Sequence, residues 1–429
     1  MLRRQASVGA ELPAWPFYLL VAGFPVWWVL GFGAFAVAMV AVPMVVLLVM
    51  RRTVRVPPAF ALWVLFVVWA AAAAIELDSA LRLVGFAVRL ANYIGAGVVF
   101  LYVYNCSERR LPRRSALLAV AGFFAFVVVG GWLGVLIPHG HLTTPAENLL
   151  PGSIASNEYV HDLVHPPFAE VQRPYGSPRT FTRPSAPFAY TNGWGCNVAL
   201  LVPLACAALS ATRRARDRAL IAGVLCAAVV PAVFTLNRGM YIALGFGLAY
   251  AAVRLAWRGH VVPLMGIMTA GVVGAFVASA AGVVSSLNER LHYSETNTGR
   301  AQVYREAFDG AVASPLLGNG APRPSQTLDI SIGTQGQVWN VMFSYGFPAL
   351  FCFIAWLVAA ALVSSRRRGV DHVWLHVVPV VALLTIVYYG YDGPQLMLVM
   401  VAAALGMRAP DREPAVPALP VAAPVPSLA

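Results

Sequence analysis

Long apolar stretches alternate with short polar interruptions along almost the whole chain. Most stretches have about 17 to 25 residues, which is long enough for a helix to cross the hydrocarbon core of a bilayer. Twelve such stretches predict an all-α, polytopic membrane protein with about twelve transmembrane helices. The predicted spans are residues 17–32, 34–50, 59–75, 84–104, 116–137, 191–211, 219–236, 239–256, 261–284, 338–363, 373–389 and 394–408.

The interruptions between the spans alternate in charge. Arginine clusters occur at every second interruption and together hold twenty of the thirty arginines. Because positively charged loops remain on the cytoplasmic side, we expect these loops and both termini to be cytoplasmic, in the cytoplasmic (inner) membrane. The clusters are Arg3/Arg4, Arg51/Arg52/Arg55, Arg109/Arg110/Arg113/Arg114, Arg213/Arg214/Arg216/Arg218, Arg254/Arg258, Arg366/Arg367/Arg368 and Arg408/Arg412.

Composition agrees with a membrane protein and excludes several other classes. The chain is 59% hydrophobic and only 11% charged, whereas soluble proteins usually have about 25% charged residues. The net charge of +12 would suggest nucleic-acid binding in a soluble chain, but here the arginines border apolar spans, so we expect no nucleic-acid partner. The five cysteines show no paired spacing, so we expect neither a disulfide framework nor a metal cluster.

Two long polar segments fall on the predicted extracytoplasmic side. Loops of this length are usually functional or disordered, and two on one face indicate a shared outward site. The Pro- and Ala-rich end is expected to be a disordered cytoplasmic tail. The predicted divisions are five N-terminal helices (1–137), a first outer loop (138–190), helices six to nine (191–284), a second outer loop (285–337), helices ten to twelve (338–408) and the tail (409–429).

Several outer arginines do not follow the positive-inside pattern. Arg183 precedes a predicted helix start marked by Asn192, and Arg238 follows Asn237 in a tight hairpin between two spans. An arginine held at the outer mouth of a helix bundle is costly to desolvate and therefore favours an anionic partner such as phosphate. Headgroup anchoring for Arg183, helix capping for Asn192 and snorkelling for Arg238 are the structural alternatives.

The second outer loop contains an amphipathic stretch. Val303, Ala307 and Ala311 share one predicted helix face, whereas Arg300 and Arg305 lie around other faces. These arginines are candidates for the same anion site. A solvated surface of ion pairs is the alternative.

Polar side chains also gather at the start of the tenth predicted span. Gln335, Gln337, Trp339 and Asn340 offer amide groups and an aromatic ring, a combination that suits carbohydrate. An interfacial anchor is the alternative.

Other chemical signals fail. The sequence HDLVH, His161 to His165, has the histidine spacing of a zinc helix but lacks the glutamate of HExxH and is followed by two prolines, so we predict no metal site. No phosphate-binding Gly-rich loop ending in Lys-Ser/Thr is present, which argues against ATP. Asp392, within YYGYDGP, is interpreted as either structural or a functional polar site.

With these residues in view, residues 180–365 resemble the O-antigen ligase and O-antigen polymerase family of integral-membrane glycosyltransferases. The similarity consists of an outer arginine before an asparagine-marked helix start, an N-R-G hairpin, an arginine opening an amphipathic helix that leads to P-L-x-G-x-G, and a polar residue before the glycine of the tenth span. The matching residues are Arg183, Asn192, Asn237, Arg238, Gly239, Arg300, Pro315, Leu316, Gly318, Gly320, Gln335 and Gly346.

The resemblance implies a GT-C-like fold and transfer of a glycan, at the outer face, from an undecaprenyl-pyrophosphate carrier to the hydroxyl of an acceptor glycan or glycolipid. It implies no metal and no other cofactor. Arg183 and Arg238, with Arg300, would bind the pyrophosphate as the glycosidic bond breaks. Asn192, Asn237, Arg305, Gln337, Trp339 and Asn340 would contact substrate.

One residue departs from the family pattern. Ligases of this family usually carry His where this chain has Gln335, and glutamine cannot accept a proton at neutral pH. Gln335 would then orient the acceptor, with deprotonation either late or handled by another group such as Glu295, His292 or Asp329. Polymerase and ligase both remain open.

Two other classes compete with the enzyme. A transporter or flippase for a lipid-linked oligosaccharide should carry polar residues near the bilayer midplane, whereas these spans are nearly free of charge at their centres. A scaffold of an envelope-assembly complex would not need converging arginines.

Overall fold

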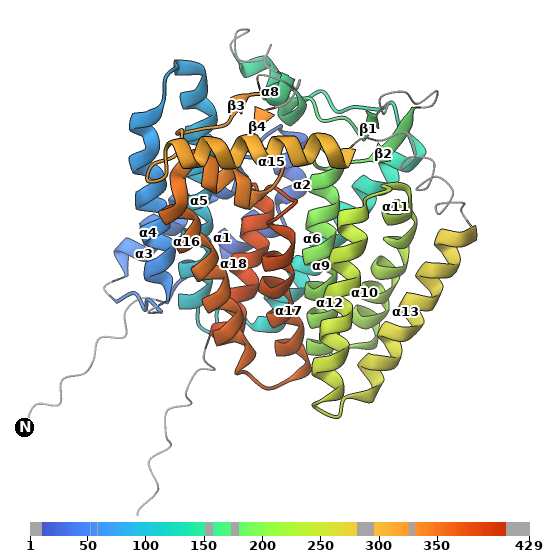
Figure 1. Ribbon diagram of the computed structural model, residues 1–429. Coiled ribbons are helices and arrows are strands. Elements are labelled where there is room, and N and C mark those ends of the chain that lie inside the picture. The colour runs from blue at the N-terminus through green and yellow to red at the C-terminus, as the bar shows by residue number, and fades with distance from the viewer. Residues whose placement is uncertain are drawn as a thin grey trace, which may run out of the picture.

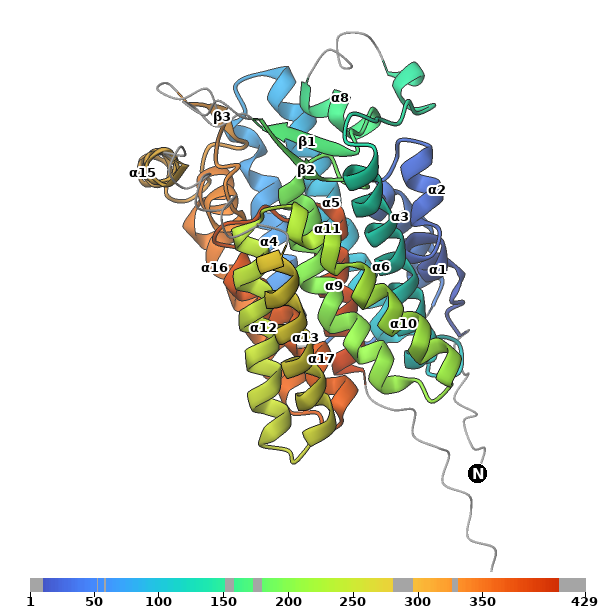
Figure 2. The ribbon, with the colours of Figure 1, turned by 90° about the vertical axis from the view of Figure 1, so that its right-hand side faces the viewer.

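The computed structural model describes residues 11–51, 53–57, 59–150, 158–172, 180–280, 296–325 and 331–408. These residues form a bundle of helices with two small antiparallel sheets, β1–β2 and β3–β4, near one end (Figures 1 and 2). Among the described residues, six helices are long and apolar enough to cross a membrane, so the prediction of a mostly helical membrane protein is confirmed. The count of twelve spans stays a prediction.

The element bounds follow the predicted spans closely. The first half contains α1 (Trp15–Val21), α2 (Phe24–Val29), α3 (Ala36–Met50), α4 (Phe60–Ala72), η1 (Ala73–Glu76), α5 (Ala80–Asn105), α6 (Arg113–Leu136), η2 (Glu147–Leu149), α8 (Glu158–Val164), β1 (Ala169–Gln172) and β2 (Phe181–Pro184). The second half contains α9 (Thr191–Ala211), α10 (Ala215–Ala227), α11 (Val229–Phe234), α12 (Arg238–Ala256), α13 (Val261–Ala280), α15 (Thr296–Ala313), β3 (Arg323–Pro324), β4 (Ser331–Ile332), α16 (Gln337–Ser365), α17 (Val370–Thr385) and α18 (Gly393–Met407).

Some predicted spans are shorter than expected. The stretch 17–32 forms two helices of 7 and 6 residues, α1 and α2, separated near Gly23. Helices α3, α17 and α18 have 15, 16 and 15 residues, which span about 22 to 24 Å at 1.5 Å per residue. Hydropathy locates these apolar segments but does not show where turns end the helices.

The arginine clusters that lie within the described residues gather at one end of the bundle, the arginine-rich end. Side-chain contacts tie them to neighbouring segments: Arg51 donates to the Asn105 carbonyl at 2.8 Å, Arg114 pairs with Asp217 at 2.7 Å, and Arg408 pairs with Glu108 at 2.6 Å. Further bonds join Arg110 to Glu11 and Arg254 to the Ser365 carbonyl. The described parts of both chain ends, Glu11 and Arg408, therefore lie at this end.

The opposite end of the bundle carries the strands and two of the polar helices, and we call it the site end. Helix α8, strands β1 to β4 and helix α15 lie there, with α15 running across the bundle axis (Figures 1 and 2). Val303, Ala307 and Ala311 are buried, as their predicted common face requires, and α15 packs on α16. Phe308 and Val312 are about half exposed. This arrangement is typical of an amphipathic helix at a membrane interface.

The bundle is organised around α9 and α18. Every residue of α18 is buried, and α9 packs against α6, α12, α17 and α18. Trp194 of α9 donates to the Val127 carbonyl of α6 at 3.1 Å, and Gly131 leaves room for its ring. Close packing of small residues drives helix association in lipid, where the hydrophobic effect contributes little.

Helix α16 is broken at Gly346, which has φ 80°. The loop Pro315–Ala321 lies beside the break and replaces helical hydrogen bonds. The Asn319 and Gly320 amides donate to the carbonyls of Phe343 and Ser344 at 2.8 Å, and the Phe347 amide donates to the Pro315 carbonyl at 2.9 Å. The P-L-x-G-x-G sequence is therefore the structural complement of the α16 break.

Arg82 holds the same loop from the α5 side. Its guanidinium donates to the carbonyl of Asn319 at 2.6 Å and to that of Ala321, and it pairs with Asp78 at 2.5 Å. This bonding holds the pKa of the Asp78 carboxyl below its usual value. Not every arginine at the site end is therefore available to a ligand.

Gly318 provides a test of the loop. A Cβ at this position would lie 2.5 Å from backbone atoms of Ser344 and Tyr345, at φ +66°. We expect Gly318→Ala to destabilise the protein by about 1–3 kcal/mol or more, from strain alone. Gly245→Ala is the control, because nothing lies within 4 Å of its added carbon. Thermal unfolding of purified protein in detergent measures the difference; equal melting temperatures would contradict the assignment.

The sidedness of the two ends is testable by cysteine labelling. Thr143 at the site end and Arg216 at the arginine-rich end are both exposed. In a variant without native cysteines, Thr143→Cys should react with a membrane-impermeant maleimide in intact cells, and Arg216→Cys only after lysis, because arginine-rich loops are retained in the cytoplasm. The reverse labelling pattern would invert the topology.

Candidate functional site

Polar helix ends meet at the site end around the segment Tyr388–Asp392, which joins α17 to α18. Tyr388 and Tyr389 bond to the start of α12, and Tyr391 bonds to the start of α16. Asp392 caps α18 through a reciprocal capping box with Gln395. We call these residues the tyrosine segment, and they connect the start of α12 at Asn237 to the start of α16 at Gln337.

Arg183 lies on β2, directly opposite Glu170 of β1, and is buried. Its Nε donates to the Thr235 carbonyl at 2.6 Å, and an Nη donates to Oε1 of Gln172 at 2.8 Å. The first bond attaches the β1–β2 hairpin to the turn between α11 and α12, and the second joins β2 to β1 within the hairpin. Two donors of the Arg183 guanidinium are thus occupied by protein acceptors. Its evident role is to position the turn before α12.

Asn237 is the most connected of the predicted residues. Its Oδ1 accepts from the Met240 amide at 3.2 Å, as the N-cap of α12, and from the Tyr389 hydroxyl at 2.6 Å. Its Nδ2 donates to the Thr191 carbonyl at 3.3 Å and to Oδ1 of the exposed Asn192 at 3.4 Å. Asn192 and Asn237 therefore lie side by side, and Asn237 serves as a junction between α9, α12 and the tyrosine segment.

Arg238 is the first residue of α12 and is half-buried. Within the described parts of the chain, its side chain makes no hydrogen bond and no ion pair. Its backbone lies at a helix N-terminus, where the helix dipole also favours an anion. Arg238 is therefore the guanidinium best placed to bind an anionic ligand.

Gln337 and Asn340 form a second polar group at the start of α16. The buried Gln337 side chain donates to the Tyr93 hydroxyl at 2.9 Å and accepts from the Tyr391 backbone amide at 2.9 Å. The Gln337 backbone amide donates to the Tyr389 carbonyl at 2.8 Å. Asn340 accepts from the Tyr93 hydroxyl at 3.4 Å. Both side chains are buried in this network, so they order the site, and neither presents an open face to substrate.

Gln335 and Trp339 lie where α15 docks. The Tyr304 ring stacks on Trp339 with centroids 4.3 Å apart, and the Tyr304 hydroxyl donates to the Gln335 carbonyl at 3.3 Å. Trp339 also donates to the Val387 carbonyl at 2.8 Å. One face of the Trp339 ring is therefore covered by protein, while Gln335 remains half-buried beside it.

The remaining candidates are only partly placed. Arg305 is exposed on α15. The backbone of Arg300 lies in the same helix, but the Arg300 side chain is outside the described part of the structure. Glu295, His292 and Asp329 also lie outside the described residues. Arg183 bonds to the carbonyl of Thr235, three residues before Arg238 in the chain. The convergence of Arg183, Arg238 and Arg300 around one outward cavity stays a prediction.

Sequence reasoning did not identify the tyrosines as the connecting element. Tyr93, Tyr389 and Tyr391 bond directly to predicted residues. The signal was the polar sequence YYGYD between two apolar spans, where only Asp392 had been noted. The Asp392 residue is exposed on one side, but burial of its carboxyl raises the pKa of that group, an effect that the charge of Arg89 opposes.

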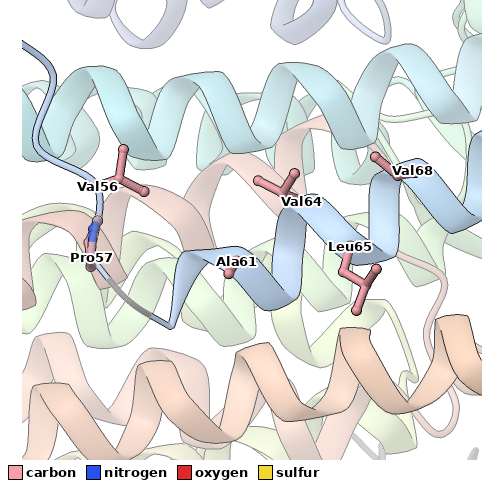
Figure 3. Close-up of a pocket in the computed structure, with 6 residues that line it drawn as sticks. All are labelled: Val56, Pro57, Ala61, Val64, Leu65 and Val68. Carbon is pink, nitrogen blue, oxygen red and sulfur yellow. The ribbon is translucent and has the colours of Figure 1, made fainter.

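An open apolar groove of about 620 Å³ lies along α4 (Figure 3). Its lining runs from Val56 and Pro57 to Val68 and contains no polar side chain, so it lacks groups for catalysis and suits lipid acyl chains. The polar cluster, and not this groove, is the candidate functional site.

Comparison with known proteins does not identify a relative. No protein-family model matches the chain, and no curated protein matches it.

The role of Asn237 as a junction gives a stability prediction. Asn237→Ala removes an N-cap, worth about 0.5–2 kcal/mol, and leaves the buried Tyr389 hydroxyl unpaired, which costs about 1–3 kcal/mol. Asn192→Ala, at an exposed position with one long bond, should change stability little. Thermal unfolding compares the two, and equal loss in both variants would contradict the junction.

Proposed function

We propose that this protein is a membrane glycosyltransferase that moves a glycan from an undecaprenyl-pyrophosphate carrier to an acceptor hydroxyl. The observation that carries the proposal is Arg238: a half-buried guanidinium at a helix N-terminus, with no partner in the described structure, beside a built polar cluster. In this proposal the protein lies in the inner membrane, with the site end facing the extracytoplasmic side and both termini facing the cytoplasm, as the arginine distribution favours.

A diphosphate suits this arrangement because a guanidinium binds two phosphate oxygens at once. Arg183 bonds to the carbonyl of Thr235, in the turn that leads to Arg238. The N-terminus of α12 adds a partial positive charge. Arg300, in the first turns of α15, supplies a third arginine to the same end of the bundle. A lipid carrier would reach such a site from the bilayer, since α15 lies at the bundle periphery with apolar residues exposed.

The reaction needs charge stabilisation more than covalent catalysis by the protein. The acceptor oxygen forms a bond to the anomeric carbon while the bond from that carbon to the phosphate oxygen breaks, and negative charge builds on the leaving diphosphate. A fixed arginine stabilises this charge, and removing one such donor typically costs about 10²- to 10³-fold in rate. This assignment requires neither a metal nor a nucleotide sugar.

The acceptor proton needs a base other than Gln335, whose amide cannot accept it. Asp392 is the carboxylate that the tyrosine segment brings to the cluster, exposed on one side and with a raised pKa. A raised pKa makes a carboxylate a better base near neutral pH. We assign proton acceptance to Asp392 and acceptor orientation to Gln335.

Arg238 provides the direct test. Purified protein in nanodiscs should transfer glycan from undecaprenyl-pyrophosphate oligosaccharide to an acceptor glycan. Arg238→Ala should reduce turnover about 10²- to 10³-fold, and Arg238→Lys less, because lysine keeps the charge but loses the fork. Arg216→Ala is the control, since Arg216 is exposed at the other end.

The outcomes separate the competing classes. Full turnover by folded Arg238→Ala would remove Arg238 from the site. A protein that moves the lipid-linked oligosaccharide across vesicles without transferring sugar would be a flippase, and one that does neither would fit a scaffold.

A further inference from the structure

The first outer segment contains a cluster of metal-binding side chains that is separate from the arginine cluster. Glu147 of η2, His161 of α8 and His165 each offer a ligand atom, and these atoms lie within 4.8 Å of one another. Nδ1 of His165 is 2.9 Å from Oε2 of Glu147. The histidine spacing was visible in the sequence, but the acidic partner comes from another segment, which explains why the pattern HDLVH alone gave no site.

We propose that Glu147, His161 and His165 bind a divalent transition-metal ion of the zinc class. Two imidazoles and a carboxylate suit zinc, whereas magnesium and calcium prefer oxygen ligands alone. Ligands bound to zinc at about 2.0–2.2 Å are about 3.3 Å apart in a tetrahedron, so small side-chain rotations complete the site. The fourth position remains for water or another ligand.

The scaffold holds the two segments together without the metal. The Thr144 hydroxyl donates to the Val164 carbonyl, the Leu142 amide donates to the Pro166 carbonyl at 3.1 Å, and the Phe168 amide donates to the Gly140 carbonyl at 2.8 Å. The ligands are therefore brought close by backbone contacts, and ordering them costs little on binding.

Neighbouring groups support the site. The His141 ring stacks on His165 with centroids 4.4 Å apart, and the His161 ring stacks on His165 at 4.9 Å. The Asp162 carboxylate lies 3.9 Å from Nδ1 of His161, too far for a hydrogen bond. A small rotation would be needed before it could orient the ring as outer carboxylates do around zinc.

The position of the cluster defines its role. The Phe168 carbonyl, just after the cluster, accepts from the amides of Ser185 and Ala186, which follow β2 and Arg183. A metal joining η2 to α8 would fix the outer segment above the β1–β2 hairpin (Figures 1 and 2). The role is structural, and it does not depend on the proposed glycosyl transfer.

The test uses full-length protein purified without a polyhistidine tag and washed with chelator. Isothermal titration with Zn²⁺ should show one ion per chain and no comparable binding of Mg²⁺. His165→Ala and Glu147→Gln should each weaken Zn²⁺ binding on the order of 100-fold, since even outer partners contribute 10- to 100-fold. His139→Ala is the matched control, because His139 is exposed in the same segment.

Two further measurements keep the test decisive. Far-UV circular dichroism and elution volume identify variants that fail to fold, and Glu147→Gln, which preserves shape, then decides. Zn²⁺ should also raise the melting temperature of the wild type and of His139→Ala, but not of Glu147→Gln. Binding that is undetectable in the wild type, or unchanged in folded His165→Ala and Glu147→Gln, would overturn the proposal and leave an ordinary histidine–glutamate pair.

Discussion

The hydrogen bond from the Tyr389 hydroxyl to Oδ1 of Asn237 is the interaction on which the site end depends. Helix ends leave backbone groups without helical partners, and beside a bilayer these groups need acceptors and donors from the protein. The tyrosine segment supplies hydrogen-bonding partners to the starts of α12 and α16, and its last residue, Asp392, caps the start of α18. This network fixes Asn237, and thereby the half-buried Arg238 that follows it.

The broken helix α16 shows the same constraint in another form. A break at Gly346 would leave carbonyls unsatisfied in an apolar environment, and the loop Pro315–Ala321 supplies their donors. Two glycines with positive φ allow the loop to approach closely, and Arg82 holds its carbonyls from α5. The break thus orders the start of α16, where Gln337 meets the tyrosine segment, without placing a charge inside the bundle.

Much of the fold followed from local sequence patterns. Apolar length located the helices, alternating charge predicted that the arginine clusters share one end, and periodicity gave the buried face of Val303, Ala307 and Ala311. The partners of individual polar groups could not be predicted, because they come from distant segments. The sequence does not show that Arg183 donates to Thr235 and Gln172, or that His161 and His165 lie beside Glu147. The number of spans also does not follow from hydropathy alone, since turns within apolar stretches depend on packing.

The central claim is that a lipid-linked diphosphate binds at the start of α12. An electron cryomicroscopy structure of the full-length protein in nanodiscs with undecaprenyl pyrophosphate tests it most directly. The account predicts diphosphate density within hydrogen-bonding distance of the Arg238 guanidinium, beside the Tyr388–Asp392 segment. Diphosphate bound elsewhere, with Arg238 directed toward lipid headgroups, would contradict it.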